Sequence, residues 1–209
     1  MRLIGRLYRI LLLPMKGLIF LVNLVSFKIN RVKIVENWNI EGIVFIINEG
    51  KIRIGRNLKA NSAKHANPIG GDTVLRFIVR KGGELVIGDH VGISNSTIVC
   101  WKSIEIGDYV FIGGGCKIWD TDFHSTNPVD RIHKFNKNVK TANIRLSDYV
   151  FIGGGSTILK GVSIGKNSVV AAGSVVTKSI PENQVWGGNP AHFIRRLQLP
   201  DNSLESKPQ

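Results

Sequence analysis

The stretch that decides the fold is residues 146–180, which read LSDYVFIGGGSTILKGVSIGKNSVVAAGSVVTKSI. Aliphatic residues recur in it at every sixth position: Leu146, Ile152, Ile158, Ile164, Val170 and Val176. Four positions after each of these stands a residue that is mostly small or β-branched: Val150, Ser156, Val162, Ser168, Ser174 and Ile180. A period of six is typical of a solenoid in which each hexad forms one short strand and a turn. We therefore predict an all-β parallel β-helix with three hexads per triangular coil and the aliphatic residues stacked inside.

The same pattern extends toward the N-terminus. Ile106, Ile112 and Ile118 begin successive hexads, and the tetrad Ile-x-Ile-Gly recurs in related forms at 52–55, 85–88, 104–107 and 162–165. Glycine, asparagine and aspartate stand between the strands, as in Gly165-Lys166-Asn167, because left-handed backbone angles at a corner cost them little. The repeat covers roughly residues 50–195.

An ordered set of motifs carries a family resemblance. The octapeptide DYVFIGGG occurs at 108–115 and again at 148–155, and ILKGVSIG (158–165), AGSVVTK (172–178) and GNPA (188–191) follow it. This order resembles the hexapeptide-repeat acyltransferases, in particular the sugar and xenobiotic O-acetyltransferase branch. The resemblance implies left-handed coiling, which the period alone does not establish. It also implies a homotrimer and acetyl-CoA as the co-substrate. We expect no metal and no disulfide framework, because the two cysteines, Cys100 and Cys116, form no CxxC pair.

The period is lost between Ile118 and Leu146, which predicts an external loop at about 122–140. In the resembled family such a loop carries the catalytic histidine, and His124 occupies that place. An imidazole titrates near neutral pH, so it can take a proton from an attacking hydroxyl as general base. We assign Asp122 to orienting the imidazole, and Asp120 and Asn95 to the acceptor. Solvated turn acids and a plain corner asparagine are the alternative interpretations.

For CoA, the resemblance implies backbone contacts at Gly154 and Ala172, and side-chain contacts from Thr177, Lys178 and Arg195. The two cations suit the phosphates of the nucleotide. This chain departs from the family at two positions: His192 stands where an arginine is frequent, and Phe151 stands where a tryptophan is frequent.

The N-terminal segment is apolar and basic. Residues 10–27 read ILLLPMKGLIFLVNLVSF, and Pro14, Lys16, Gly17 and Asn23 interrupt them. Seven Lys and Arg precede the first acid, Glu36, so much of the net charge of +13 lies here. We expect an amphipathic segment over 1–35 that lies on the cytoplasmic face of a membrane. A helix packed on the body and a true span are the alternatives. The β-helix is expected over 36–190, and a short helix with a tail over 191–209.

The leading functional prediction is a cytoplasmic, acetyl-CoA-dependent O-acetyltransferase that acts on a sugar of a cell-surface polysaccharide or its precursor. The alternative is N-acetylation of an amino-sugar nucleotide, since an amine needs the same base. Zinc-binding scaffolds of the carbonic-anhydrase type and a purely structural solenoid fit less well. The charge would suit nucleic acid, but no motif or aromatic platform for it is present.

Overall fold

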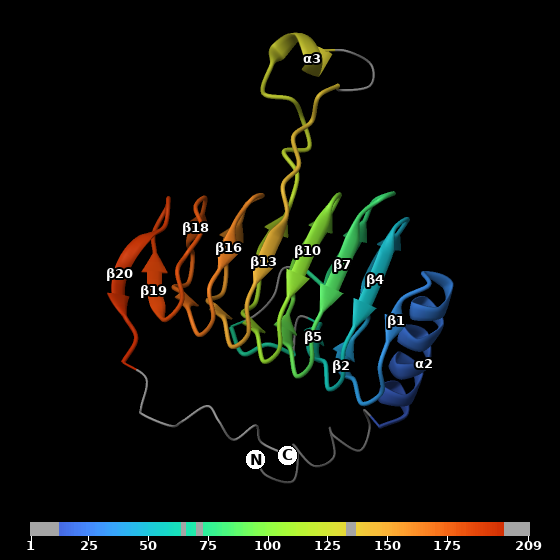
Figure 1. The fold of residues 1–209 in the computed structure, drawn as a ribbon. Helices are drawn as coiled ribbons and strands as arrows, with labels where there is room; N and C mark the ends of the chain where they lie inside the picture. Colours follow the sequence, from blue (N-terminus) through green and yellow to red (C-terminus); the bar gives the residue numbers. More distant parts are fainter. Residues whose placement is uncertain (1–12, 64–65, 70–72, 133–136, 199–209) are drawn as a thin grey trace.

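The computed structural model describes residues 13–63, 66–69, 73–132 and 137–198. It confirms the left-handed parallel β-helix, with three sheets that form the faces of a prism (Figure 1). Sheet A contains β1 (Lys33–Ile34), β4 (Lys51–Ile54), β7 (Glu84–Ile87), β10 (Ser103–Ile106), β13 (Ile144–Leu146) and β16 (Ser163–Ile164). Sheet B contains β2 (Asn39–Gly42), β5 (Lys59–Ser62), β8 (Gly92–Ser94), β11 (Phe111–Ile112), β14 (Phe151–Ile152), β17 (Val169–Val170), β19 (Gln184–Gly187) and β20 (His192–Arg196). Sheet C contains β3 (Phe45–Asn48), β6 (Arg76–Val79), β9 (Thr97–Cys100), β12 (Lys117–Trp119), β15 (Thr157–Ile158) and β18 (Val175–Val176).

The coils stack in register even where the sequence spacing between them changes. In sheet A, Ile87 pairs with Ile106, Ile106 with Leu146, and Leu146 with Ile164. The middle step crosses a much longer stretch of chain than the other two, yet the strands align as closely. The added residues therefore leave the coil at a corner and do not shift the ladder.

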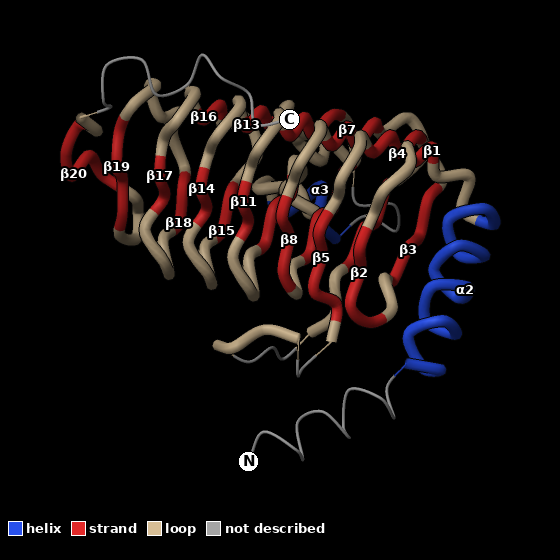
Figure 2. The backbone as a smooth tube through the Cα atoms, turned by 90° about the horizontal axis from the view of Figure 1, so that it is seen from below, coloured by secondary structure: helices blue, strands red, loops and turns tan. Residues whose placement is uncertain are grey.

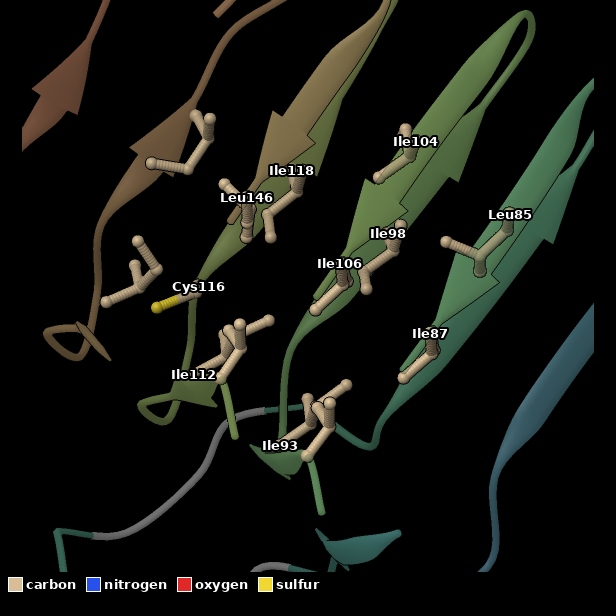
Figure 3. Packing of buried hydrophobic residues seen from close by; sticks show 14 of the residues in the cluster. Leu85, Ile87, Ile93, Ile98, Ile104, Ile106, Ile112, Cys116, Ile118 and Leu146 are labelled. Atoms are coloured by element: carbon tan, nitrogen blue, oxygen red, sulfur yellow. The ribbon is translucent and has the colours of Figure 1, made fainter. Parts of the chain in front are cut away.

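The interior is a column of aliphatic side chains. Figure 3 shows residues such as Ile104, Ile106, Ile112 and Ile118 pointing inward from neighbouring strands, and each is at most 3% exposed. Burying one such side chain contributes roughly 1.5–3 kcal/mol relative to leaving it in water. Stacking like on like in every coil is what the six-residue period encodes.

Aspartates and left-handed residues shape the corner between sheets A and B. The carboxylate of Asp148 accepts the backbone N–H of Asp108 at 2.9 Å, and that of Asp108 accepts the N–H of Asp89 at 2.8 Å. Tyr109 and Tyr149 take positive φ values of 56° and 60°, and their rings stack 5.1 Å apart. Each acid thus binds the backbone of the preceding coil and holds the corner in line.

The two ends of the prism are closed differently. The helix α2 (Leu13–Ile29) lies beside the first coil, where Figure 2 shows it next to β2 and β3. Asn23, fully buried, donates to the Gly42 carbonyl and accepts from the Val44 N–H. Phe20 stacks on Trp38 with ring centroids 4.5 Å apart. Within the described residues no helix is long and apolar enough to cross a membrane.

At the opposite end the expected C-terminal helix is wrong over its described part. Residues 192–196 form β20, which runs antiparallel to β19 and pairs Arg195 with Val185. An open sheet edge leaves backbone donors and acceptors unpaired, and a returning strand satisfies them. The tail from residue 199 lies outside the described residues.

Candidate active site

The chain leaves the β-helix after β12 and returns before β13 as a projecting excursion, residues 121–141. Its stem is held by the antiparallel bridge between Thr121 and Thr141 and by a 3.0 Å hydrogen bond from the Asp122 N–H to the Lys140 carbonyl. The short helix α3 (Pro128–Ile132) lies near its tip, well away from the body (Figure 1). The excursion is thus a stalk with an ordered base.

His124 lies at that base. The preceding residue, Phe123, has a φ of 59° and packs edge-on against Trp101 and Trp119, with centroid distances of 6.1 and 5.9 Å. The His124 N–H donates to the Asp122 carbonyl at 2.6 Å, and the side chain is exposed. The aromatic contacts hold the backbone while the imidazole faces outward, as a general base that meets a substrate requires.

Asp122 has a partner that the sequence analysis missed. Its Oδ1 lies 2.9 Å from the Nζ of Lys160, which stands at the same corner one coil further on. The Gly161 N–H, next in the chain, donates to the Ala142 carbonyl at 3.2 Å. No local signal pairs residues 122 and 160, since only the coil stacking brings them together. That Asp122 orients the imidazole stays a prediction.

Asp120 does not lie where an acceptor ligand would need it. Its side chain is fully buried, and its carboxylate accepts the backbone N–H groups of Trp101, Lys102 and Ser103 at 2.7–2.8 Å. With both oxygens occupied, it holds the corner after β9. The predicted contact with the acceptor is therefore replaced by a structural role.

Asn95 lies at the other edge of sheet C. It is fully buried with a φ of 41°, its Nδ2 donates to the Ala63 carbonyl at 3.2 Å, and its Oδ1 meets no partner among the described residues. The four residues of β9 span roughly 13 Å at the rise of a strand. Asn95 and His124 are therefore not brought together within one chain.

Four of the five predicted CoA residues lie at the two edges of sheet C, and the fifth lies on sheet B. Gly154 and Ala172 lie at the corner between sheets B and C, where the coils approach so closely that a Cβ on Gly153 would stand 2.5 Å from the Ala172 nitrogen. Thr177 and Lys178 follow β18 at the corner that carries the excursion, and both are exposed. Arg195 is exposed on β20. Exposed backbone and cations are the donors that a phosphorylated, extended cofactor needs.

The cysteines take no part in a reactive site. Burial, and then the nearby Asp120 carboxylate, raise the pKa of the Cys100 thiol to about 12. Burial also raises the pKa of Cys116. Across the described ranges no three His, Cys, Asp or Glu side chains gather as they would around a metal ion.

Comparison with known proteins shows which proteins share this sequence and fold. A family model described as "Hexapeptide repeat of succinyl-transferase" matches residues 148–178. A Staphylococcus aureus protein named "Putative acetyltransferase" is 35% identical over an alignment of 137 positions that covers 57% of this chain and 67% of the relative. The galactoside O-acetyltransferase of Lactococcus lactis is 38% identical over 107 residues, 51% of this chain and 50% of the enzyme.

Among solved structures, a hexapeptide-repeat acetyltransferase of Vibrio cholerae in complex with acetyl-CoA is 36% identical, with a TM-score of 0.51. The match covers 55% of this chain and 61% of that one. The chain spans between 50% and 67% of the length of the curated relatives it matches. On the repeat, the stacked coils and these identities, the chain belongs to the hexapeptide-repeat acetyltransferases.

Proposed function

We propose that this protein transfers an acetyl group from acetyl-CoA to a hydroxyl of a sugar in a cell-surface polysaccharide or its precursor. One observation carries the proposal: the exposed His124 stands on an anchored stem at one corner of the hexapeptide coils, where Lys178 is also exposed. Glycine backbone lies at the corner between sheets B and C. Acetyl-CoA is bound in the Vibrio structure, and the Lactococcus relative is named for a galactoside acceptor.

The chemistry requires one base. His124 takes the proton as the acceptor oxygen attacks the thioester carbon, and a backbone N–H stabilises the tetrahedral oxyanion. The C–S bond then breaks, the acetyl group stays on the acceptor, and the imidazolium returns its proton to the CoA sulfur. In this mechanism Asp122 orients the ring, and its ion pair with Lys160 supports that role.

The assembly that completes the site is a homotrimer. Support comes from the resemblance to hexapeptide-repeat acyltransferases, in which the loop that carries the histidine reaches into the cleft between trimer subunits. The exposed His124 at the base of the projecting excursion suits such a cleft.

The helix α2 suits contact with the cytoplasmic face of a membrane. It contains no acid, and eight of its large apolar side chains are between 38% and 73% exposed: Met15, Leu18, Phe20, Leu21, Val22, Leu24, Val25 and Ile29. Lys16, Lys28, Arg31 and Lys33 supply charge for anionic headgroups. Flotation with anionic vesicles tests this: we expect binding that Leu18→Glu with Leu21→Glu abolishes, and equal recovery of both proteins would refute it.

N-acetylation of an amino-sugar nucleotide is the second candidate, because an amine acceptor uses the same base. A Bacillus cereus N-acyltransferase has the same fold, with a TM-score of 0.58 at 22% identity, and this likeness concerns the fold alone.

The test is acetyl-CoA consumption with a panel of glycans, hexosides and amino-sugar nucleotides. We expect acceptor-dependent release of CoA that falls by about 10²–10⁴-fold in His124→Ala. If His124→Ala releases CoA at the wild-type rate, His124 is not the general base. An O-acetylated glycan or hexoside as the product would indicate O-transfer, and an N-acetylated amino-sugar nucleotide would indicate N-transfer.

A further inference from the structure

A groove of ≈ 720 Å³ lies between α2 and the outer face of sheet B. One wall is formed by Met15, Ile19 and Phe20 of α2 and by Trp38, which directly precedes β2. The floor is formed by β2, β5, β8, β11 and β14. The volume falls within the range of about 300–1,000 Å³ that small-molecule sites occupy. His124 does not line this groove, and of the family motifs only the two DYVFIGGG copies reach it, through Phe111 and Phe151 among others.

The floor carries an aromatic row. The register of sheet B aligns Lys59, Gly92, Phe111 and Phe151 on successive coils. Phe111 and Phe151 are 55% and 46% exposed, although both could have been polar at no cost to the interior. A Cβ on Gly92 would stand 2.7 Å from Cδ1 of Phe111, so the ring of Phe111 lies over the glycine backbone. This places one aromatic edge low in the floor, toward α2.

A polar row runs beside the aromatic one. Asn61 pairs with Ser94 across β5 and β8, and its Nδ2 donates to the Ser94 Oγ at 3.0 Å. That bond leaves the Asn61 Oδ1 as an acceptor and the Ser94 hydroxyl proton as a donor. Both residues are half-buried, so their polar atoms are partly desolvated and their hydrogen bonds discriminate between ligands. Lys16, Lys59 and Glu41 give the groove two cations and one acid.

We propose that this groove binds the saccharide acceptor. A pyranose ring has an apolar C–H face and an edge of hydroxyls, and the floor offers an aromatic row next to a donor and an acceptor. The inference rests on the proposed acetyl transfer and extends it by naming where the acceptor lies. Phe151 stands three residues before Gly154, a predicted CoA contact, so the acetylated sugar binds at that end. The units that follow it extend toward Trp38 and α2.

The test measures binding and turnover separately. The probes are methyl galactoside, maltose and a tetramer of N-acetylglucosamine, titrated by calorimetry against the full chain and against His124→Ala. Phe111→Ala and Asn61→Ala remove one element of each row. Phe45→Ala is the matched control, since Phe45 is 40% exposed on β3 of sheet C, outside the groove.

We expect at least one saccharide to bind, and to bind about tenfold more weakly to Phe111→Ala and Asn61→Ala than to wild type or Phe45→Ala. The KM for the acceptor rises by the same factor while the KM for acetyl-CoA is unchanged. Equal binding by wild type and both groove variants, or no binding of any probe to wild type, overturns the inference. Equal melting temperatures show that the variants are folded.

The two proposals fail in different ways. Saccharide binding that depends on Phe111, without acetyl transfer to any acceptor, would refute the proposed function and leave a saccharide site. Transfer that depends on His124 but is indifferent to both groove substitutions would refute only the groove.

Discussion

The β-helical body and the excursion are built on opposite principles. In the body each aliphatic residue lies above its counterpart in the preceding coil, so Ile104 pairs with Leu85 on one side and Ile144 on the other. In the excursion α3 has no buried residue, and the stem is held by one bridge, a few backbone bonds and the packing of Phe123. The body therefore provides most of the stability, and the excursion carries the residue proposed as the general base. A solenoid permits this division because a corner can expel a segment without disturbing the ladder.

Core truncation gives the largest contrast between the two regions. Ile104→Ala removes a fully buried side chain from β10 and leaves a cavity, so we expect the free energy of unfolding to fall by about 2–5 kcal/mol. Ile132→Ala, on α3 with a side chain 84% exposed, should change it by less than about 0.5 kcal/mol. Urea unfolding of both variants measures the difference, and equal losses would show that the excursion is part of the folded core.

The next contrast is between the reactivity of a thiol buried in the body and that of the same thiol in the unfolded chain. With the pKa of Cys100 raised from 9.0 to about 12, its thiolate fraction near pH 8 is about a thousandfold below that of an ordinary thiol. We expect iodoacetamide to label Cys100 in the native protein at least that much more slowly than in urea, with a rate that rises with pH well beyond 9. Peptide mapping after timed labelling measures it. Rapid native labelling at pH 8 would mean that this corner opens.

A substitution at the base of the excursion should lower the free energy of unfolding as a substitution in the β-helical body does. Asp120→Asn keeps the size of the side chain, removes its charge and turns an N–H group toward backbone donors. We expect a loss of about 2 kcal/mol in the free energy of unfolding. The matched variant Asp130→Asn lies on α3, where Asp130 accepts from Ser125 and Asn138 at 3.2 and 3.1 Å, and should cost less. Thermal unfolding that ranks the two in the reverse order would contradict the structural role of Asp120.

The smallest effect is expected for the ion pair between stem and body. Asp122 and Lys160 are partly exposed, with side-chain accessibilities of 27% and 30%. A double-mutant cycle with Asp122→Asn and Lys160→Met should give a coupling of less than about 1 kcal/mol in stability. The same cycle on kcat should give a larger coupling if Asp122 positions His124. Additive effects on kcat would mean that the pair has no part in catalysis.

Much of the fold could be predicted because its signal is local and repeated. The hexads from Leu146 to Val176 occur without a slip, so each buried position confirms the next. The loss of that period predicts the excursion, and the family resemblance implies the place of His124 on it. The role predicted for Asp120 was wrong because the sequence around an acid before a loop does not show whether its carboxylate faces solvent or accepts three backbone N–H groups. The predicted C-terminal helix was wrong because residues 192–196 pair with the free edge of β19. That edge is formed by the folded coil, and no local sequence pattern indicates it.

By itself the sequence determined the coil, its interior column, the corner residues and the point where the chain leaves the body. These follow from spacing, because a side chain at every sixth position has one direction in which to be buried. The tertiary structure alone decided which distant residues share a corner or a face. In the folded chain Lys160 contacts Asp122, and α2 lies along sheet B. Asn61 is hydrogen-bonded to Ser94 next to Phe111. Stacking sets these contacts, since neighbours across coils lie 16 to 40 residues apart in the chain and are chosen by register, not by sequence proximity.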